Sequence, residues 1–350
     1  MDGVAYITQC PILPGQTFVY RIKADPIGTS FYRADIADQH SMGLYGPIII
    51  RRHQMQQQYS GEIIVTLQDW NHVMDSETAY QRMVSQQFDL GTGEPIGTTM
   101  SVDTANFSRF EFQSGLVNGK GRYWMNLNAN NGSPLEKVKV NQGELIRYRI
   151  IGAMTQYPMR VYIEDQWVTL RGSDCYNLDA LNVQSIIVHP GERFDFSFTF
   201  GHAERKQYLL IAETIETRES HGGYHAAEAI IEIEDYSGIV NPNPPNNKVI
   251  CANGANCTIF NCPFAFSGIK DQMCINFNNV TNKEPDGHPE IVENVDEEYF
   301  FNFGFPGPHS DAPGSVNGRE FVFPVSPLLT QSDKLKTRCT DMDCIGSTCK

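Results

Sequence analysis

The feature that most constrains the fold is a short pattern that occurs three times, in which a turn containing glycine precedes a strand of alternating polar and apolar residues. The copies are residues 14–18 (PGQTF), 142–146 (QGELI) and 190–194 (PGERF). Glycine permits the turn, and alternation with a period of two is the pattern of a half-buried strand. A longer echo pairs residues 117–120 (VNGK) with 316–319 (VNGR). Repeats of this kind predict tandem β-sandwich domains of one type.

The other predicted elements are also strands, because short β-branched or alternating runs lie between glycine, proline and asparagine turns. Few stretches have a helical repeat, and the best candidate is residues 78–88 (TAYQRMVSQQF). We expect a strand in residues 15–24, where Phe18, Tyr20 and Ile22 alternate with polar neighbours, and a hairpin over residues 138–151 around Gln142 and Gly143. Further strands are predicted at 44–51, 62–67, 116–120, 159–170 and 183–200, the last of these broken at Pro190.

Composition limits the possible partners. The chain has 350 residues, of which 41% are hydrophobic and 19% charged, as in a globular protein with room for two or three domains. A formal net charge of −14 disfavours nucleic acid and anionic membranes as partners. There is no apolar run of about 18 residues, so no transmembrane helix is expected. The first residues have no signal-peptide pattern, which alone would favour a cytosolic protein.

The cysteines and glycosylation motifs favour secretion instead. Seven of the nine cysteines crowd into the last hundred residues, a density typical of disulfide-bonded secreted proteins. All nine are disulfide candidates: Cys10, Cys175, Cys251, Cys257, Cys262, Cys274, Cys339, Cys344 and Cys349. Asn-x-Ser/Thr sequons at Asn106, Asn131, Asn256 and Asn279 point the same way. An odd cysteine count without a signal sequence suggests a piece of a longer protein.

The stretch from Thr29 to Ile50 (TSFYRADIADQHSMGLYGPIII) resembles the end of the first domain of laccase-type multicopper oxidases. The family pattern is T-x-W-Y-H-S-H-x-x-x-Q-R-x-D-G-L-x-G-P, and six positions are in register: Tyr32, Gln39, Gly43, Leu44, Gly46 and Pro47. Residues 1–12, 117–123, 183–196 and 315–324 also look like segments of animal laccase-like oxidases, which are similar to ferroxidases. The resemblance implies an all-β fold of tandem cupredoxin-like (plastocyanin-like) Greek-key β-sandwiches.

It also implies that Met1 is an internal methionine, because residues 1–12 match an internal segment of the family, and that Cys10 corresponds to a cysteine that often bridges to the far C-terminal end. The family's copper ligands come from four motifs: His-Trp-His-Gly and His-x-His early, then His-Pro-x-His-x-His-Gly and His-Cys-His late. On a strand, residues i and i+2 face the same side, so His-x-His presents two imidazoles to adjacent coppers.

Copper ligation is where this chain departs from the family. Arg33 and Asp35 replace the two histidines of His-x-His, and no such pair occurs among His40, His53, His72, His189, His202, His221, His225, His288 and His309. The other three motifs would fall outside the chain. Arginine has no lone pair for a metal, and an isolated carboxylate is a harder ligand than this cluster takes. We therefore predict no catalytic and no metal-ligating residues, no copper bound by this chain, and an Arg33–Asp35 ion pair.

Other candidate residues have simpler interpretations. His221 and His225 are four residues apart, but Gly222 and Gly223 between them disfavour the helix that would align them. We interpret Trp70 as core, His72 as structural and His40 as a surface loop residue. Acidic side chains take up iron in ferroxidase relatives, but the spacing of Glu164, Asp165 and Asp174 does not distinguish them from ordinary solvated carboxylates.

The predicted organisation has four parts. Residues 1–66 are the C-terminal part of cupredoxin domain 1, 67–236 are domain 2, 237–290 are a linker and a cysteine-rich loop pinned by bridges, and 291–350 are the start of domain 3. The resemblance implies a secreted oxidase that takes single electrons from phenols or ferrous ion and reduces oxygen to water. The alternative is a non-catalytic secreted scaffold or interaction protein. The oligomeric state is left open.

Overall fold

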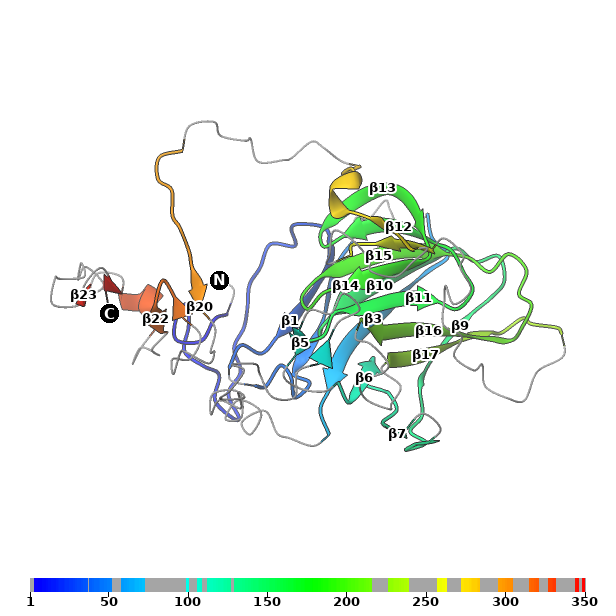
Figure 1. Cartoon of the computed structure of the whole chain (residues 1–350), viewed down its shortest axis with the longest axis horizontal. Helices are drawn as coiled ribbons and strands as arrows, with labels where there is room; N and C mark the ends of the chain where they lie inside the picture. The colour runs from blue at the N-terminus through cyan, green and yellow to red at the C-terminus, as the bar shows by residue number, and fades with distance from the viewer. Residues whose placement is uncertain are drawn as a thin grey trace.

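The computed structural model describes residues 3–36, 38–51, 58–72, 99–100, 106–108, 112–126, 129–215, 226–238, 257–262, 272–283, 295–304, 315–320, 327–331, 344–345 and 348–349. This part of the chain is nearly all β-structure, which confirms the predicted fold class. Figure 1 shows one large sandwich of strands, with the short C-terminal strands drawn apart from it and close to the N-terminus. No helix among the described residues is long and apolar enough to cross a membrane.

Two sheets form the sandwich. The six-stranded sheet has the order β13 (Tyr176–Val183), β12 (Val168–Ser173), β15 (Arg193–Phe198), β10 (Ile146–Gly152), β3 (Gly61–Trp70) and β6 (Ser114–Val117). The seven-stranded sheet has the order β19 (Gln272–Ile275), β18 (Cys257–Phe260), β14 (Ser185–Val188), β11 (Met159–Ile163), β16 (Gln207–Thr214), β17 (Ala226–Ile233) and β9 (Glu136–Val140).

Smaller elements complete the described structure. The pair β1 (Gly28–Arg33) and β2 (Tyr45–Ile50) forms an antiparallel hairpin. The remaining small sheets are β20 (Phe303–Gly304), β21 (Ser315–Val316) and β22 (Arg319–Glu320); β4 (Thr99–Met100) and β5 (Asn106–Ser108); β7 (Trp124–Asn126) and β8 (Ala129–Asn130); and β23 (Cys344–Ile345) and β24 (Thr348–Cys349). Two short 3-10 helices are η3 (Phe277–Asn279) and η4 (Leu328–Gln331).

Aromatic side chains from both sheets fill the core between them. Tyr148 on β10 stacks on Phe196 of β15 with ring centroids 4.9 Å apart. Phe194 meets Phe260 of β18 edge to face at 5.7 Å, so the core continues into the cysteine-rich segment. All four rings are at most 1% exposed. Burial of such large apolar surfaces is the main favourable term in folding a sandwich of this size.

The three glycine turns have the same local structure, which confirms the internal repeat. Gly15, Gly143 and Gly191 have φ of 78°, 78° and 89°, a region that favours glycine. In each turn the side chain of the residue after the glycine accepts a hydrogen bond from the backbone N–H three residues before it. These pairs are Gln16 with Leu13, Glu144 with Asn141 and Glu192 with His189. A side chain therefore closes each turn on its own backbone.

The predicted hairpin over residues 138–151 is wrong. The strands β9 and β10 on either side of Gly143 do not pair with each other, because β9 pairs with β17 and β10 pairs with β15 and β3. The turn carries the chain from the seven-stranded to the six-stranded sheet. The turn at Gly191 makes the same crossing between β14 and β15. Alternation predicted the strands correctly, but it does not say which sheet each strand joins.

The second echo is also confirmed at the level of hydrogen bonds. Asn118 and Asn317 both have positive φ, and each is followed by a glycine with positive φ. Asn118 exchanges backbone and side-chain hydrogen bonds with Thr66 of β3. Asn317 makes the same set with Asn302, which lies just before β20. Asparagine tolerates the left-handed conformation, so this tight turn can pin the neighbouring strand in both places.

The strand predicted over residues 15–24 is not formed. Phe18, Tyr20 and Ile22 are 43%, 45% and 65% exposed, and no described residue forms a strand ladder with this segment. A strand is stabilised by its neighbours, so alternation alone does not produce one. The predicted helix at residues 78–88 lies outside the described residues.

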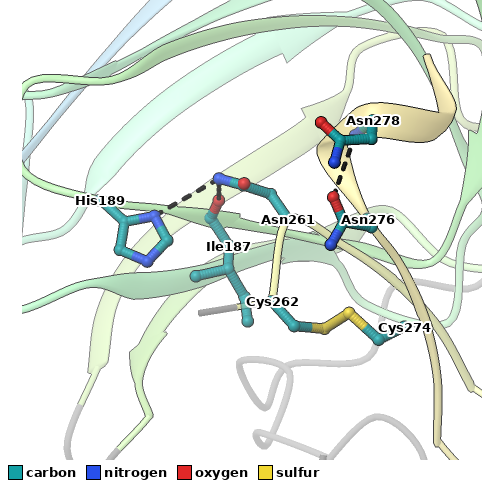
Figure 2. Close-up of a disulfide and its surroundings, with 7 residues drawn as sticks. All are labelled: Ile187, His189, Asn261, Cys262, Cys274, Asn276 and Asn278. Carbon is teal, nitrogen blue, oxygen red and sulfur yellow. Dashed lines mark hydrogen bonds between the residues drawn. A yellow bond between two sulfur atoms is a disulfide. The ribbon is translucent and has the colours of Figure 1, made fainter. Parts of the chain in front are cut away.

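The cysteine-rich segment differs from the loop that was expected. The strands β18 and β19 extend the seven-stranded sheet in parallel from β14. The expected bridge is present as the Cys262–Cys274 disulfide, which links the residues that follow β18 to β19 (Figure 2). The predicted boundary between residues 66 and 67 falls inside β3. The division into domains otherwise stays a prediction.

Candidate functional site

The β1–β2 hairpin holds Arg33 and Asp35, the two residues at the positions that resemble the His-x-His motif. Arg33 is the last residue of β1, opposite Tyr45 at the start of β2. Its Nη1 lies 3.3 Å from Oδ1 of Asp35, with side chains 50% and 41% exposed, which confirms the predicted ion pair. Guanidinium offers no lone pair, and the carboxylate already faces a cation. These two side chains do not suit copper.

His40 is more deeply placed than the surface position predicted for it. Its ring lies 6.2 Å from Phe31 and 6.0 Å from Tyr45, and its Nε2 is buried without a hydrogen-bond partner among the described residues. Burial lowers the pKa of His40, and the nearby charge of Arg33 lowers it further, against a hydrogen bond with the backbone of Ala153 that raises it. The imidazole is therefore neutral at pH 7.

Two side chains of β3 fix the surroundings of His40. The Gln68 amide donates hydrogen bonds to the carbonyl oxygens of His40 at 3.2 Å and Ser41 at 3.0 Å, and Gln68 is 1% exposed. Beside it, the Asp69 carboxylate accepts backbone N–H bonds from residues 155, 156 and 157 at 2.8 to 3.1 Å. The loop of the hairpin is thus attached to the sandwich through a satisfied, buried amide.

A buried charged network joins the other end of the hairpin to the six-stranded sheet. We call it the Asp195 cluster, and it consists of Thr29, Glu62, Arg147, Arg149 and Asp195. The Asp195 carboxylate accepts from Thr29 Oγ1 at 2.7 Å, from Arg147 Nη2 at 2.6 Å and from Arg149 Nη1 at 2.8 Å. Arg149 Nη2 also donates to Glu62 at 2.5 Å. Charges so deep in a protein are tolerated only when they are paired in this way.

Four members of the Asp195 cluster are buried, and the fifth, Glu62, has a side chain that is 22% exposed. Thr29 is 0% exposed, Asp195 2%, Arg149 4% and Arg147 6%. Burial raises the pKa of Glu62, but hydrogen bonds from Arg149 and Arg51 outweigh it and hold that pKa below its usual value. The sequence patterns did not predict this cluster. The sequence does contain a pattern that could have indicated it. Charged residues lie within apolar strands at residues 146–151 (IRYRII) and 194–196 (FDF), and such residues are often buried in pairs.

His72 was predicted to be structural and Trp70 to be part of the core, and the structure agrees fully only for His72. The Nε2 of His72 is hydrogen-bonded to Ser114 Oγ at 2.7 Å, and its ring lies 4.4 Å from that of Tyr123, so its role is structural. Burial lowers the pKa of His72. Trp70 is only partly buried, at the end of its strand. His221 and His225 lie outside the described residues.

The three acidic candidates are engaged in local structure. Glu164 is 0% exposed rather than solvated as expected, and it pairs with Arg205 at 3.2 Å. Asp165 pairs with the same arginine at 3.0 Å, and Asp174 pairs with Arg193 at 3.0 Å. Burial raises the pKa of Glu164. These pairings leave no cluster of free carboxylates at this place.

Glu228 on β17 was not singled out by sequence, although it is only 6% exposed. Burial, with a smaller contribution from the charge of Glu164, raises the pKa of Glu228 to about 7 against the opposing charge of Arg122.

No group of three or more His, Cys, Asp or Glu side chains within the described ranges is placed to hold a metal ion.

The cysteine and sequon predictions have mixed outcomes. Cys262 and Cys274 form a disulfide, and Cys257 is also disulfide-bonded. Cys10 and Cys175 are free thiols in the structure, so their pairing stays a prediction. No bonding can be assigned to the remaining candidates, because Cys251 and Cys339 lie outside the described residues and the side chains of Cys344 and Cys349 are not described.

Among the sequons, Asn131 and Asn279 are exposed, the side chain of Asn106 is not described, and Asn256 lies outside the described residues. An exposed asparagine can carry a glycan without a clash, so two of the four predicted sites are sterically open. Glycosylation itself stays a prediction.

The two facing sheets place the chain among proteins built from cupredoxin-like sandwiches, and comparison with known proteins specifies the family. Two family models, both described as multicopper oxidase, match residues 1–55 and 61–234, together more than half of the chain. The chain belongs to the multicopper oxidase family.

Individual relatives agree with this assignment. Laccase-4 of Trametes villosa is 26% identical over 355 residues, covering 99% of this chain and 56% of that protein. L-ascorbate oxidase of Nicotiana tabacum is 28% identical over 232 residues, covering 60% of this chain and 36% of that protein. The chain thus spans about half the length, or less, of these curated relatives.

Solved structures with the same fold include the multicopper oxidase Fet3p, which functions in iron import, and a laccase from Botrytis aclada. Each aligns with a TM-score of 0.52, at 18% and 20% identity respectively. The alignments cover 72% and 71% of this chain and 42% of each of those chains. At such identities the likeness concerns the fold alone.

Proposed function

We propose that this chain is a laccase-like member of the multicopper oxidase family that does not hold the family's three-copper cluster and is not catalytic. The observation that carries the proposal is the Arg33–Asp35 ion pair, 3.3 Å long, at the positions that resemble the His-x-His motif. A permanent cation at a ligand position repels copper, and it also occupies the one carboxylate that could bind a metal. Such a protein acts as a secreted scaffold or interaction module.

An active oxidase is the second candidate, and the match to a laccase along nearly the whole chain favours it. The resemblance implies copper as the cofactor, phenols or ferrous ion as electron donors, and oxygen as the acceptor. Copper would supply the one-electron chemistry. Within this chain neither Arg33 nor Asp35 suits that role, so no step of the reaction is assigned to them.

The decisive experiment measures copper in the complete gene product that contains this chain, purified from the medium after expression with copper. Oxidase activity is measured on a diphenol and on ferrous ion. We expect fewer than four coppers per chain and no turnover. Four coppers with turnover on either substrate would overturn the proposal.

A double variant, Arg33→His with Asp35→His, tests the motif itself. It should raise the bound copper, because two imidazoles would replace two side chains that already lie within 3.3 Å of each other. The chain offers a matched control in Lys23→His with Asp25→His. These two residues also form an exposed i,i+2 ion pair, 3.0 Å long, but lie outside the motif. Equal copper gain in both double variants would mean that the position of Arg33 is not special.

A further inference from the structure

One of the four sequons has a feature that the others lack. Phe277 lies two residues before Asn279 in the sequence FNNVT, whereas the residues two before Asn106, Asn131 and Asn256 are threonine, alanine and glycine. An aromatic ring at this distance is within reach of the first sugar of a glycan on the asparagine. The question is whether the structure holds ring and asparagine in suitable positions.

The short helix η3 places both residues at the surface. Asn276 caps it, because its side-chain oxygen accepts a hydrogen bond from the Asn278 backbone N–H at 3.0 Å (Figure 2). Phe277 is 44% exposed, and its ring lies 6.0 Å from that of Phe260, which is fully buried. One side of the Phe277 ring therefore rests on the core and another side faces solvent. The helix is short, but the cap and this ring contact fix its direction.

The residues after Asn279 are held equally well. Val280 packs against the core of the sandwich, and the Thr281 carbonyl accepts a hydrogen bond from the Asp179 N–H at 3.0 Å. Asn279 and Thr281, the two residues that a glycosylating enzyme recognises, are both exposed. No described group is hydrogen-bonded to the Asn279 side chain, so its amide nitrogen is open to modification.

The neighbouring disulfide supplies the cellular context. Cys262 and Cys274 are bonded in the segment that leads directly into η3. Structural disulfides persist in oxidising compartments, which include the endoplasmic reticulum and the extracellular space. Asparagine-linked glycans are added in the same secretory route. Sequon and disulfide therefore point to one compartment.

We propose that Asn279 carries an N-linked glycan whose first N-acetylglucosamine stacks on the exposed side of Phe277. In the transfer, the Asn279 amide nitrogen forms a bond to C1 of the sugar and loses a proton, while the bond from C1 to the phosphate of a lipid-diphosphate oligosaccharide breaks. The C–H bonds on the sugar face carry small positive charge, and the aromatic face is negative, so the two faces attract. The glycan covers a ring that would otherwise be exposed next to β19, the last strand of the seven-stranded sheet among the described residues.

The first test is occupancy. The complete gene product is secreted from eukaryotic cells, and its peptides are analysed by mass spectrometry before and after removal of glycans by an amidase. We expect a glycan on Asn279, and its loss in Asn279→Gln but not in Asn131→Gln. Secreted protein with Asn279 unmodified would overturn the proposal. This outcome is independent of copper, so it leaves the proposed function untouched.

The second test is the stacking. Samples trimmed to a single N-acetylglucosamine are compared in thermal unfolding with Asn279→Asp, which has the residue that the amidase leaves. We expect the sugar to raise the midpoint by about 2 °C, the shift expected of one weak aromatic contact in a domain of this size. The same comparison in a Phe277→Leu background, which keeps an apolar side chain but removes the aromatic face, should give a difference near zero. An equal sugar effect in both backgrounds would refute the stacking.

Discussion

Replacing Asp195 with asparagine tests whether the Asp195 cluster fastens the β1–β2 hairpin to the sandwich. The carboxylate is 2% exposed and accepts hydrogen bonds from both Arg147 and Arg149. An amide of the same shape removes the negative charge and turns an NH2 group toward the guanidinium groups. It leaves two buried cations facing a neutral side chain, so the variant measures charge compensation rather than packing.

Asp195→Asn removes one partner from a buried ion pair, which should lower the free energy of unfolding by about 3 to 5 kcal/mol. Arg149 keeps its bond to Glu62 at 2.5 Å, and Arg147 keeps a contact at 3.4 Å to Asn177. These remaining partners favour the lower end, about 3 kcal/mol. Against a total stability of roughly 5 to 15 kcal/mol, this is a large fraction. It corresponds to a fall in Tm of roughly 6 to 12 °C for a domain of 150 to 250 residues.

Urea unfolding followed by far-UV circular dichroism gives the free energy of unfolding for each variant. The matched control is Asp165→Asn, because Asp165 pairs with Arg205 at 3.0 Å but is 55% exposed. An exposed pair contributes about 0.2 to 1 kcal/mol, so this control should change little. If Asp195→Asn costs no more than the control, the cluster is not a fastening and the argument from burial fails.

Three further predictions concern titration and the disulfide. The pKa of Glu228 is raised to about 7 in the folded protein, so its stabilising effect is full at low pH and is lost as pH rises from about 4.5 to 7. Glu228→Gln should remove this slope, up to about 3 kcal/mol, in unfolding curves measured between pH 4 and 8. The pKa of His40 is lowered in the folded state, so stability is lost as pH falls below 6.5, and His40→Gln should flatten the curve there. An unchanged pH profile in either variant contradicts the corresponding burial argument. Replacing Cys262 and Cys274 by serine should cost about 3 kcal/mol, because the bridge closes a 12-residue separation. A reductant should lower the stability of the wild type by more than that of the double variant, because the bridge of Cys257 is reduced in both.

Local patterns in the sequence were sufficient for the repeated turns. A turn whose third position has positive φ favours glycine there, and a turn with positive φ at both central positions favours Asn-Gly. The turns at Gly143, Gly191 and Asn118 therefore follow from chemistry within a few residues. The ion pair of Arg33 with Asp35 was equally local, since i and i+2 on an extended chain face one side. These predictions held because no distant residue has to take part in them.

Partners distant in the sequence determined the rest. Residues 15–24 have the alternation of a strand but no described neighbour to pair with. The segment that contains β18 and β19 was expected as loop, yet β18 pairs with β14 and β19 pairs with β18. His40 was expected at the surface, yet it is hydrogen-bonded to two residues of the sandwich, Gln68 and Ala153. Burial and pairing depend on which segments meet in space, and alternation carries no information on that.

The sequence by itself determined the family resemblance, the all-β class, the turns and the ion pair of Arg33 with Asp35. Only the tertiary structure showed that Thr29 and Asp195, 166 residues apart, share one buried hydrogen bond, and that Phe277 packs on the buried Phe260 while its side chain stays 44% exposed. The physical reason is that residue identity fixes which groups can ligate or turn. Packing decides which of these groups are removed from water. It therefore decides whether a charge pair is buried and whether an aromatic ring stays exposed.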